Sequence, residues 1–216
     1  MSTNIYLIRH GEAVSNVEPI MGGDKGCRGL TERGLAQAQA LARRLEGGEI
    51  PADVLYASDL PRAQQTAEAV ARALKLPIVW DRELQELRPG EADGMHIDEA
   101  RARFRTFEVF FKEFYTPIAP GGESWGSFVA RASAALERII DRHQGQNVVL
   151  VCHGGVIEAS FFHLLQLGMG VRGRAAFHVR NTAITHWRQV DTKDDRHEWQ
   201  LVAHNDHWHL NDMDER

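Results

Sequence analysis

The feature that most constrains the fold is a set of short, apolar, β-prone runs, each followed by polar residues. They are Asn4–Ile8, Asp53–Ala57 and Val148–Cys152. Runs of this length and composition are typical of buried strands. Amphipathic helical patterns lie between them, and strands that alternate with helices indicate crossover connections. We therefore predict an α/β fold, a three-layer sandwich whose central sheet is mostly parallel and has helices on both faces.

Two segments carry the three- and four-residue spacing of helices that bury one face. Leu35, Ala38, Leu41, Ala42 and Leu45 follow a candidate N-cap, Thr31, and precede a stop at Gly47. The second set, which follows Gly121–Ser124, comprises Val129, Ala132, Leu136, Ile139 and Ile140. Late in the chain, Ala183–Trp187 and Trp199–Ala203 are predicted to form two more strands near an edge of the sheet.

The stretch from Ile97 to Tyr115 combines regularly spaced phenylalanines with several arginines. We interpret it as one inserted amphipathic helix that lies over the end of the sheet as a lid.

Composition limits the remaining choices. The 216 residues are 43% hydrophobic and 25% charged, without a repeat or a long linker, so residues 1–216 are predicted to form one domain. A net charge of -5 argues against nucleic-acid or membrane-surface partners, and no apolar run has the length of a membrane span. Two cysteines fit a reducing compartment, so we expect a cytoplasmic protein.

Polar groups follow each of the three apolar runs predicted to be buried strands. Arg9-His10-Gly11 follows the first, Ser58 to Arg62 the second, and His153-Gly154-Gly155 the third. The carboxyl ends of parallel strands meet at one crevice, where ligands of open α/β sheets bind. Guanidiniums bind phosphate oxygens, histidine can act as a nucleophile, and glycine lets backbone N–H groups approach an anion. This set suits phosphoryl transfer.

These motifs, in this order, resemble the histidine phosphatase superfamily, also called phosphoglycerate mutase-like (branch 1). The resemblance covers nearly the whole chain. It rests on Leu7–Glu12 with Asn16, Leu30–Gly34, Ser58–Thr66, Leu84–Glu86 with Gly90 and Gly94, Pro120–Ser124, Val151–Gly155, Asn181–Thr185, and Asn205-Asp206 with His209-Leu210.

The resemblance implies that His10 is a nucleophile that becomes transiently phosphorylated. Arg9, Arg62 and His153 would hold the phosphoryl oxygens, and Gly154 would add a phosphate contact. Asn16 either adds an amide donor to the phosphate or only forms an Asx turn. Because arginines would supply the positive charge, neither a metal nor a cofactor is expected.

Glu86 is implied as the proton donor and later as the base that activates water. Glu83 and Glu91 lie close by in the sequence and are alternatives for this role. The segment Arg88–Gly94 also lacks the aromatic residue that the family often has before the second glycine.

The function implied is metal-independent hydrolysis of small phosphomonoesters through a phosphohistidine, with a small phosphorylated metabolite as the binding partner. A cofactor-dependent phosphoglycerate mutase is the alternative, although Ser15 stands where such mutases usually have tryptophan. A non-catalytic protein that binds a phosphorylated ligand is less consistent with the presence of His10, Glu86 and His153. The sequence leaves the physiological substrate and the oligomeric state open, a homodimer being one option.

Two other chemistries have partial signals. Cys27 and Arg33 have the spacing of a cysteine-phosphatase loop, but the preceding segment is not a buried strand. His204, His207 and His209 suggest a metal, but their spacing matches no common zinc pattern.

Overall fold

The computed structural model describes residues 2–168, 171, 174–192 and 197–211. Within this part of the chain the backbone forms a sheet with the strand order β3-β2-β4-β1-β5-β6. The strands are β1 (Thr3–Arg9), β2 (Val54–Ala57), β3 (Ile78–Trp80), β4 (Asn147–Cys152), β5 (Ile184–Asp191) and β6 (His197–Asp206).

The sheet is mostly parallel, as predicted. Strand β1 pairs with β4, β4 with β2, and β2 with β3, all in parallel. On the other side, β1 pairs with β5 and β5 with β6 in antiparallel fashion, which places the two late strands at one edge. Strand β3 was not predicted, because it is short and both Val79 and Trp80 are exposed.

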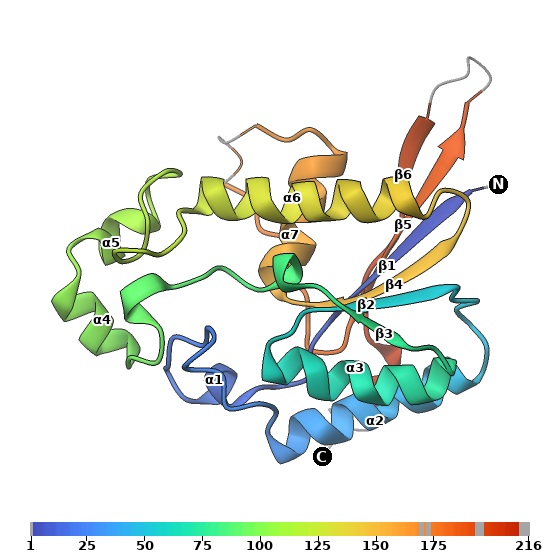
Figure 1. Ribbon diagram of the computed structural model, residues 1–216, viewed down its shortest axis with the longest axis horizontal. Coiled ribbons are helices and arrows are strands. Elements are labelled where there is room, and N and C mark those ends of the chain that lie inside the picture. The colour runs from blue at the N-terminus through green and yellow to red at the C-terminus, as the bar shows by residue number, and fades with distance from the viewer. Residues whose placement is uncertain (1, 169–170, 172–173, 193–196, 212–216) are drawn as a thin grey trace.

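Helices cover both faces of the sheet (Figure 1). One layer contains α2 (Glu32–Glu46) and α3 (Pro61–Leu74), and the other contains α6 (Trp125–Arg142) and α7 (Gly154–Leu164). Each layer packs on its own core, which confirms the three-layer prediction. Thr31 caps α2 as predicted, since its hydroxyl accepts from the N–H of Gly34, whereas Leu35 is exposed and lies outside the core.

The predicted lid is two short helices rather than one. Helix α4 (Ile97–Arg103) and helix α5 (Thr106–Phe110) are separated at Phe104, which has an extended backbone. Phe104, Phe107 and Phe110 all enter a small separate core. Both helices lie beyond the carboxyl ends of the parallel strands (Figure 1).

The remaining elements are single turns. They are α1 (Val14–Val17), η1 (Arg82–Leu84), η2 (Gly90–Ala92) and η4 (Trp208–Leu210). Of the helices described, none is both long enough and apolar enough to cross a membrane.

Candidate active site

His10 directly follows β1, and its hydrogen bonds define which ring nitrogen can react. Nδ1 lies 2.6 Å from the carbonyl oxygen of Gly11. A carbonyl can only accept, so Nδ1 carries the proton and Nε2 carries a lone pair. On that side of the ring, Nε of Arg62 donates to Nε2 at 3.1 Å. The lone pair of Nε2 accepts this hydrogen bond, so a phosphoryl group must draw Nε of Arg62 away before Nε2 can attack phosphorus.

Burial and neighbouring charge keep the His10 ring neutral. The side chain is almost fully buried, and desolvation lowers the pKa of His10 well below its usual value. The positive charges of Arg62 and Arg9 lower this pKa further. A neutral imidazole at pH 7 keeps its lone pair available.

Two arginines flank His10 from different elements. Arg9 ends β1, and its Nη1 donates to the carbonyl oxygen of Val179 at 2.7 Å. Arg62 lies in the first turn of α3, and its Nη1 donates to the carbonyl oxygen of Gly22 at 2.7 Å. These backbone contacts fix both guanidiniums while leaving other N–H groups to meet an anion.

His153 is placed behind His10 rather than in the pocket wall. It follows β4, is fully buried, and its ring lies 5.1 Å from that of His10 between centroids. Nε2 is hydrogen-bonded to Oγ of Ser58 at 2.8 Å. Desolvation, with Arg62 next in effect, lowers the pKa of His153 well below its usual value. Among the described residues, the buried atoms without hydrogen-bond partners include His153 Nδ1 and Arg9 Nε. Of these two residues Arg9 lines the pocket, where ligand oxygens can pair with its Nε.

Glu86 faces the same site from the segment after η1. Its Oε2 accepts from the N–H of Gly155 at 3.0 Å, and its Oε1 accepts from the N–H of Leu87 at 2.9 Å. A Cβ on Gly155 would overlap with Oε1 of Glu86, so only glycine at the start of α7 allows this approach. The carboxylate is thus oriented by the backbone on both sides.

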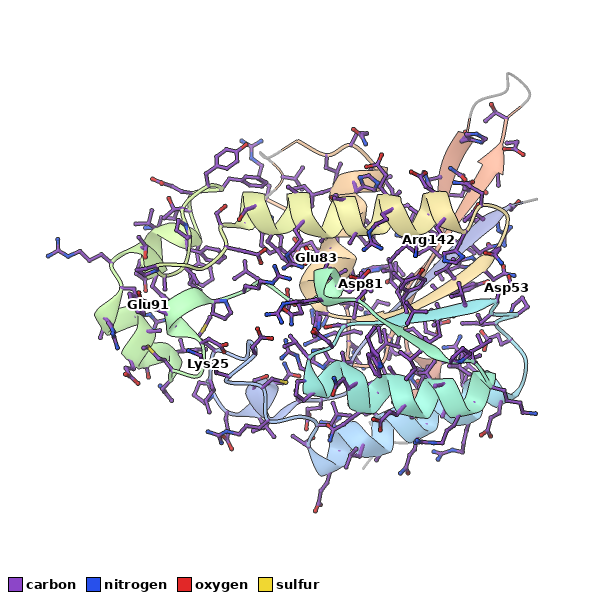
Figure 2. The ribbon with its side chains drawn as sticks, in the orientation of Figure 1. Lys25, Asp53, Asp81, Glu83, Glu91 and Arg142 are labelled. Carbon is purple, nitrogen blue, oxygen red and sulfur yellow. The ribbon has the colours of Figure 1, made fainter. Side chains whose placement is uncertain are left out.

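The alternative carboxylates lie elsewhere. Glu83 pairs with Arg88 at 3.0 Å, and Glu91 is an exposed residue of η2 near α4 (Figure 2). Of these three residues, only Glu86 lines the pocket that contains His10.

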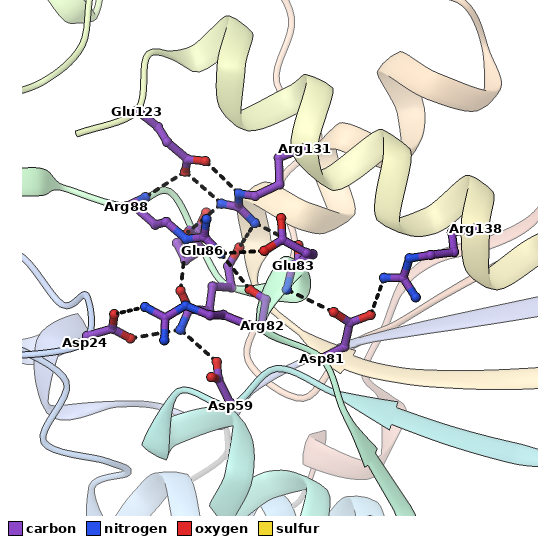
Figure 3. Close-up of polar contacts among 11 residues, drawn as sticks. Asp24, Asp59, Asp81, Arg82, Glu83, Glu86, Arg88, Glu123, Arg131 and Arg138 are labelled. Atoms are coloured by element: carbon purple, nitrogen blue, oxygen red, sulfur yellow. Dashed lines mark hydrogen bonds and ion pairs between the residues drawn. The ribbon is translucent and has the colours of Figure 1, made fainter. Parts of the chain in front are cut away.

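A partly buried arginine on α6, which no sequence motif indicates, holds the Glu86 segment. The guanidinium of Arg131 donates to the carbonyl oxygens of Glu83 at 2.7 Å, Gln85 at 3.1 Å and Glu86 at 3.3 Å (Figure 3). Glu123 binds its other edge at 2.6 and 2.7 Å. Glu123 also accepts from the N–H of Arg88. Arg131 therefore acts as a positioning residue for Glu86.

We expect Arg131→Met to lower kcat by about tenfold, because Glu86 loses the clamp on its backbone. It should also destabilise the fold by about 3 kcal/mol, because Glu123 is left buried without its partner. Arg138→Met is the matched control. Arg138 lies further along α6, is exposed, and pairs with Asp81 rather than with the Glu86 segment. The measurements are thermal denaturation and phosphate release. In the double variant Arg131→Met/Glu123→Leu, stability should recover and kcat should not; recovery of both would contradict positioning.

Asn16 and Asn181 organise the loop beside His10. The side-chain oxygen of Asn16 accepts from the N–H of Ala13 at 2.9 Å and from Nδ2 of Asn181 at 3.4 Å. Asn181 also donates to the carbonyl oxygen of His10 at 3.0 Å. Since the oxygen of Asn16 is used in the turn, only its Nδ2 can face a phosphate. The bond to Ala13 reaches back three residues, so it is a capping contact at the start of α1 rather than the expected Asx turn. The phosphate contact of Asn16 stays a prediction.

These side chains meet in a pocket of about 590 Å³ between the strand ends and the lid. Most of the site residues expected from the sequence line it: Arg9, His10, Asn16, Arg62, Glu86 and Gly154. His153 is not among the described lining residues, although its ring lies 5.1 Å from that of His10 between centroids.

The other partial signals are placed away from this pocket. Cys27 is not among the described lining residues, and Arg33 lines a different cavity and pairs with Glu12 at 3.6 Å. Burial raises the pKa of the Cys152 thiol, which keeps it protonated. His204 and His209 bind Thr185 and Thr182, respectively, and the described residues include no cluster suited to a metal.

Known proteins share both sequence and fold with this chain. The family model of the histidine phosphatase superfamily (branch 1) matches residues 5–207. A metal-independent phosphoserine phosphatase of Arabidopsis thaliana is 36% identical over 167 residues, which is 76% of this chain and 69% of the relative. A 2,3-bisphosphoglycerate-dependent phosphoglycerate mutase of Methylobacterium sp. (strain 4-46) is 34% identical over 165 residues, which is 74% of this chain and 79% of the relative.

A solved structure of mycobacterial glucosyl-3-phosphoglycerate phosphatase with VO3 superposes with a TM-score of 0.77 at 26% identity. That superposition covers 94% of this chain and 99% of the other. The chain belongs to the histidine phosphatase superfamily, branch 1. Its relatives and structural neighbours support a phosphatase or a mutase.

Proposed function

We propose that this protein is a phosphatase that hydrolyses small phosphorylated metabolites through a phosphohistidine on His10. The observation that carries the proposal is the geometry of His10. Its Nδ1 is tied to the carbonyl of Gly11, so the lone pair lies on Nε2, beside Arg62 and in one pocket with Glu86. A nucleophile, fixed cations and a proton donor are the parts that two-step phosphoryl transfer needs.

In the first step, Nε2 of His10 attacks phosphorus and the bond from phosphorus to the ester oxygen breaks. Glu86, protonated at this stage, gives its proton to the departing alkoxide. Arg9 and Arg62 stabilise the charge on the phosphoryl oxygens, which is the main catalytic task in a loose transition state. Because Nδ1 of His10 keeps its proton, the ring of the phosphoenzyme carries one positive charge. The carbonyl oxygen of Gly11 stabilises this charge by accepting the hydrogen bond from Nδ1.

In the second step, a water molecule attacks the phosphohistidine while Glu86, now a carboxylate, accepts its proton. The bond between phosphorus and Nε2 breaks, inorganic phosphate leaves, and His10 returns to its neutral state. Glu86 therefore serves as acid and base in turn.

We expect hydrolysis to proceed in buffer treated with EDTA, because two guanidiniums supply the positive charge that a metal supplies elsewhere. The assay is phosphate release from a panel of phosphomonoesters, before and after chelation. Vanadate should inhibit competitively, since its five-coordinate form matches the geometry of in-line transfer. Activity lost in EDTA and restored by a divalent cation would overturn the metal-free assignment.

A mutase is the second candidate, favoured by the 34% identity to a phosphoglycerate mutase. A mutase returns the phosphoryl group of His10 to another hydroxyl rather than to water. Incubation with 3-phosphoglycerate and a catalytic amount of 2,3-bisphosphoglycerate, which would first phosphorylate His10, distinguishes the two, because a phosphatase releases inorganic phosphate whereas a mutase forms 2-phosphoglycerate.

A further inference from the structure

We propose that the pocket selects phosphomonoesters whose leaving group is apolar and uncharged. This inference rests on the proposed phosphatase activity and adds a substrate class to it. The pocket has two chemically different ends. Arg9, His10, Arg62 and Glu86 form the phosphate end, and hydrophobic side chains form the outer end.

The outer end is built by segments that are far apart in the sequence. Its apolar side chains include Ile20 from the loop after α1, Leu87 after Glu86, three phenylalanines of the lid and Trp125 at the start of α6. The phenylalanines are Phe107, Phe110 and Phe111. Aromatic and aliphatic walls next to a few fixed polar groups are the usual design of a site for an apolar organic group.

The outer end also offers little to an anionic leaving group. Among the described lining residues, Arg101 is the one guanidinium besides Arg9 and Arg62. It is already paired with Asp98 at 3.1 Å and with Glu108 at 2.8 Å. A substrate carboxylate would have to compete with Asp98 and Glu108 for Arg101.

Phe111 has the exposure expected of a contact that a ligand completes. Phe107 and Phe110 are buried, but Phe111 is 58% exposed while its ring packs edge-on against both, at 5.6 and 5.2 Å between centroids. An apolar group in the pocket would remove part of this aromatic surface from water, which favours binding.

The size of the pocket agrees with an organic group larger than serine or glycerate. Its volume of about 590 Å³ lies in the range of roughly 300–1,000 Å³ that is typical of sites for drug-sized ligands. A phosphate at His10 would occupy only the inner end.

The test compares three alkyl phosphates, so that leaving-group chemistry is similar: 3-phenylpropyl phosphate, ethyl phosphate and O-phosphoserine. We expect kcat/KM for 3-phenylpropyl phosphate to exceed that for ethyl phosphate by about 30-fold, from the burial of the added carbons. O-phosphoserine should be no better than ethyl phosphate. A higher kcat/KM for O-phosphoserine than for 3-phenylpropyl phosphate would overturn the inference while leaving the phosphatase assignment intact.

A pair of variants tests whether the lid causes the preference for an apolar leaving group. Phe111→Ser should reduce the ratio of kcat/KM for 3-phenylpropyl over ethyl phosphate by about fivefold, through a higher KM for the larger ester. Tyr115→Ser is the matched control, because Tyr115 is an exposed aromatic residue of the same segment outside the described pocket lining. An unchanged ratio in Phe111→Ser, or an equal loss in both variants, would contradict this assignment. Release of phosphate from none of the esters would overturn the proposed function, and the inference with it.

Discussion

Replacement of His10 by alanine is expected to lower kcat/KM for phosphomonoester hydrolysis by a factor on the order of 10⁴ or more, because it removes the attacking atom. The expected loss follows from geometry: Nε2 of His10 has its lone pair beside Arg62, in a pocket that Cys27 does not line. Steady-state phosphate release measures the effect. Labelling with a ³²P-phosphoester should give a phosphoenzyme with the wild-type protein and none with His10→Ala.

Cys27→Ser is the control for this prediction, since Cys27 and Arg33 have the spacing of a thiolate phosphatase loop. Activity close to wild type is expected, because the residues of that loop lie outside the site. If Cys27→Ser were inactive and His10→Ala retained activity, the thiolate reading would replace the histidine one.

The second large effect is expected at Glu86. A general acid matters most for a poor leaving group, so Glu86→Gln should lower kcat for an alkyl phosphate by a factor on the order of 10² or more. For p-nitrophenyl phosphate, whose leaving group departs without much help, phosphorylation should slow much less. Single-turnover phosphorylation measured by rapid quench separates the two cases. Glu83→Gln and Glu91→Gln are the matched controls.

The same substitution should make the intermediate visible. Because the missing base also slows attack by water, phosphohistidine should accumulate with p-nitrophenyl phosphate. An alkaline quench should preserve the label and an acid quench should remove it, as expected for a phosphoramidate. Equal losses for both substrates would falsify the role of Glu86 and move it to another carboxylate.

The sequence was sufficient to place the residues that follow strands. His10, Arg62 and His153 come directly after apolar runs or in the next turn, so the predicted sheet brought them to one edge. Arg131 could not be found this way. The carbonyl groups that it binds, that of Glu86 among them, lie on a loop far away in the sequence, and an arginine on an amphipathic helix ordinarily faces solvent. Likewise, no pattern shows that the Gly11 carbonyl sets the tautomer of His10.

The fold was predictable where periodicity reflects burial. Strands β1 and β4 and helices α2 and α6 bury their expected faces. The errors occurred where local pattern and burial diverge. Strand β3 pairs through its backbone while the side chains of Val79 and Trp80 stay exposed, and the phenylalanines of the lid have helical spacing although Phe104 breaks the helix. That this segment acts as a lid stays a prediction.

The position of β1 within the sheet has a consequence for how the protein folds. Asn4 lies opposite Asn147 on one side and Arg188 on the other, so both neighbours of the strand that carries His10 come from late parts of the chain. Synthesis proceeds from the N-terminus, and pairing over such sequence separations closes large loops and is slow. The nascent chain therefore carries His10 long before β4 and β5 exist to enclose β1. Catalytic competence should appear in one late step, when β4 and then β5 enclose β1.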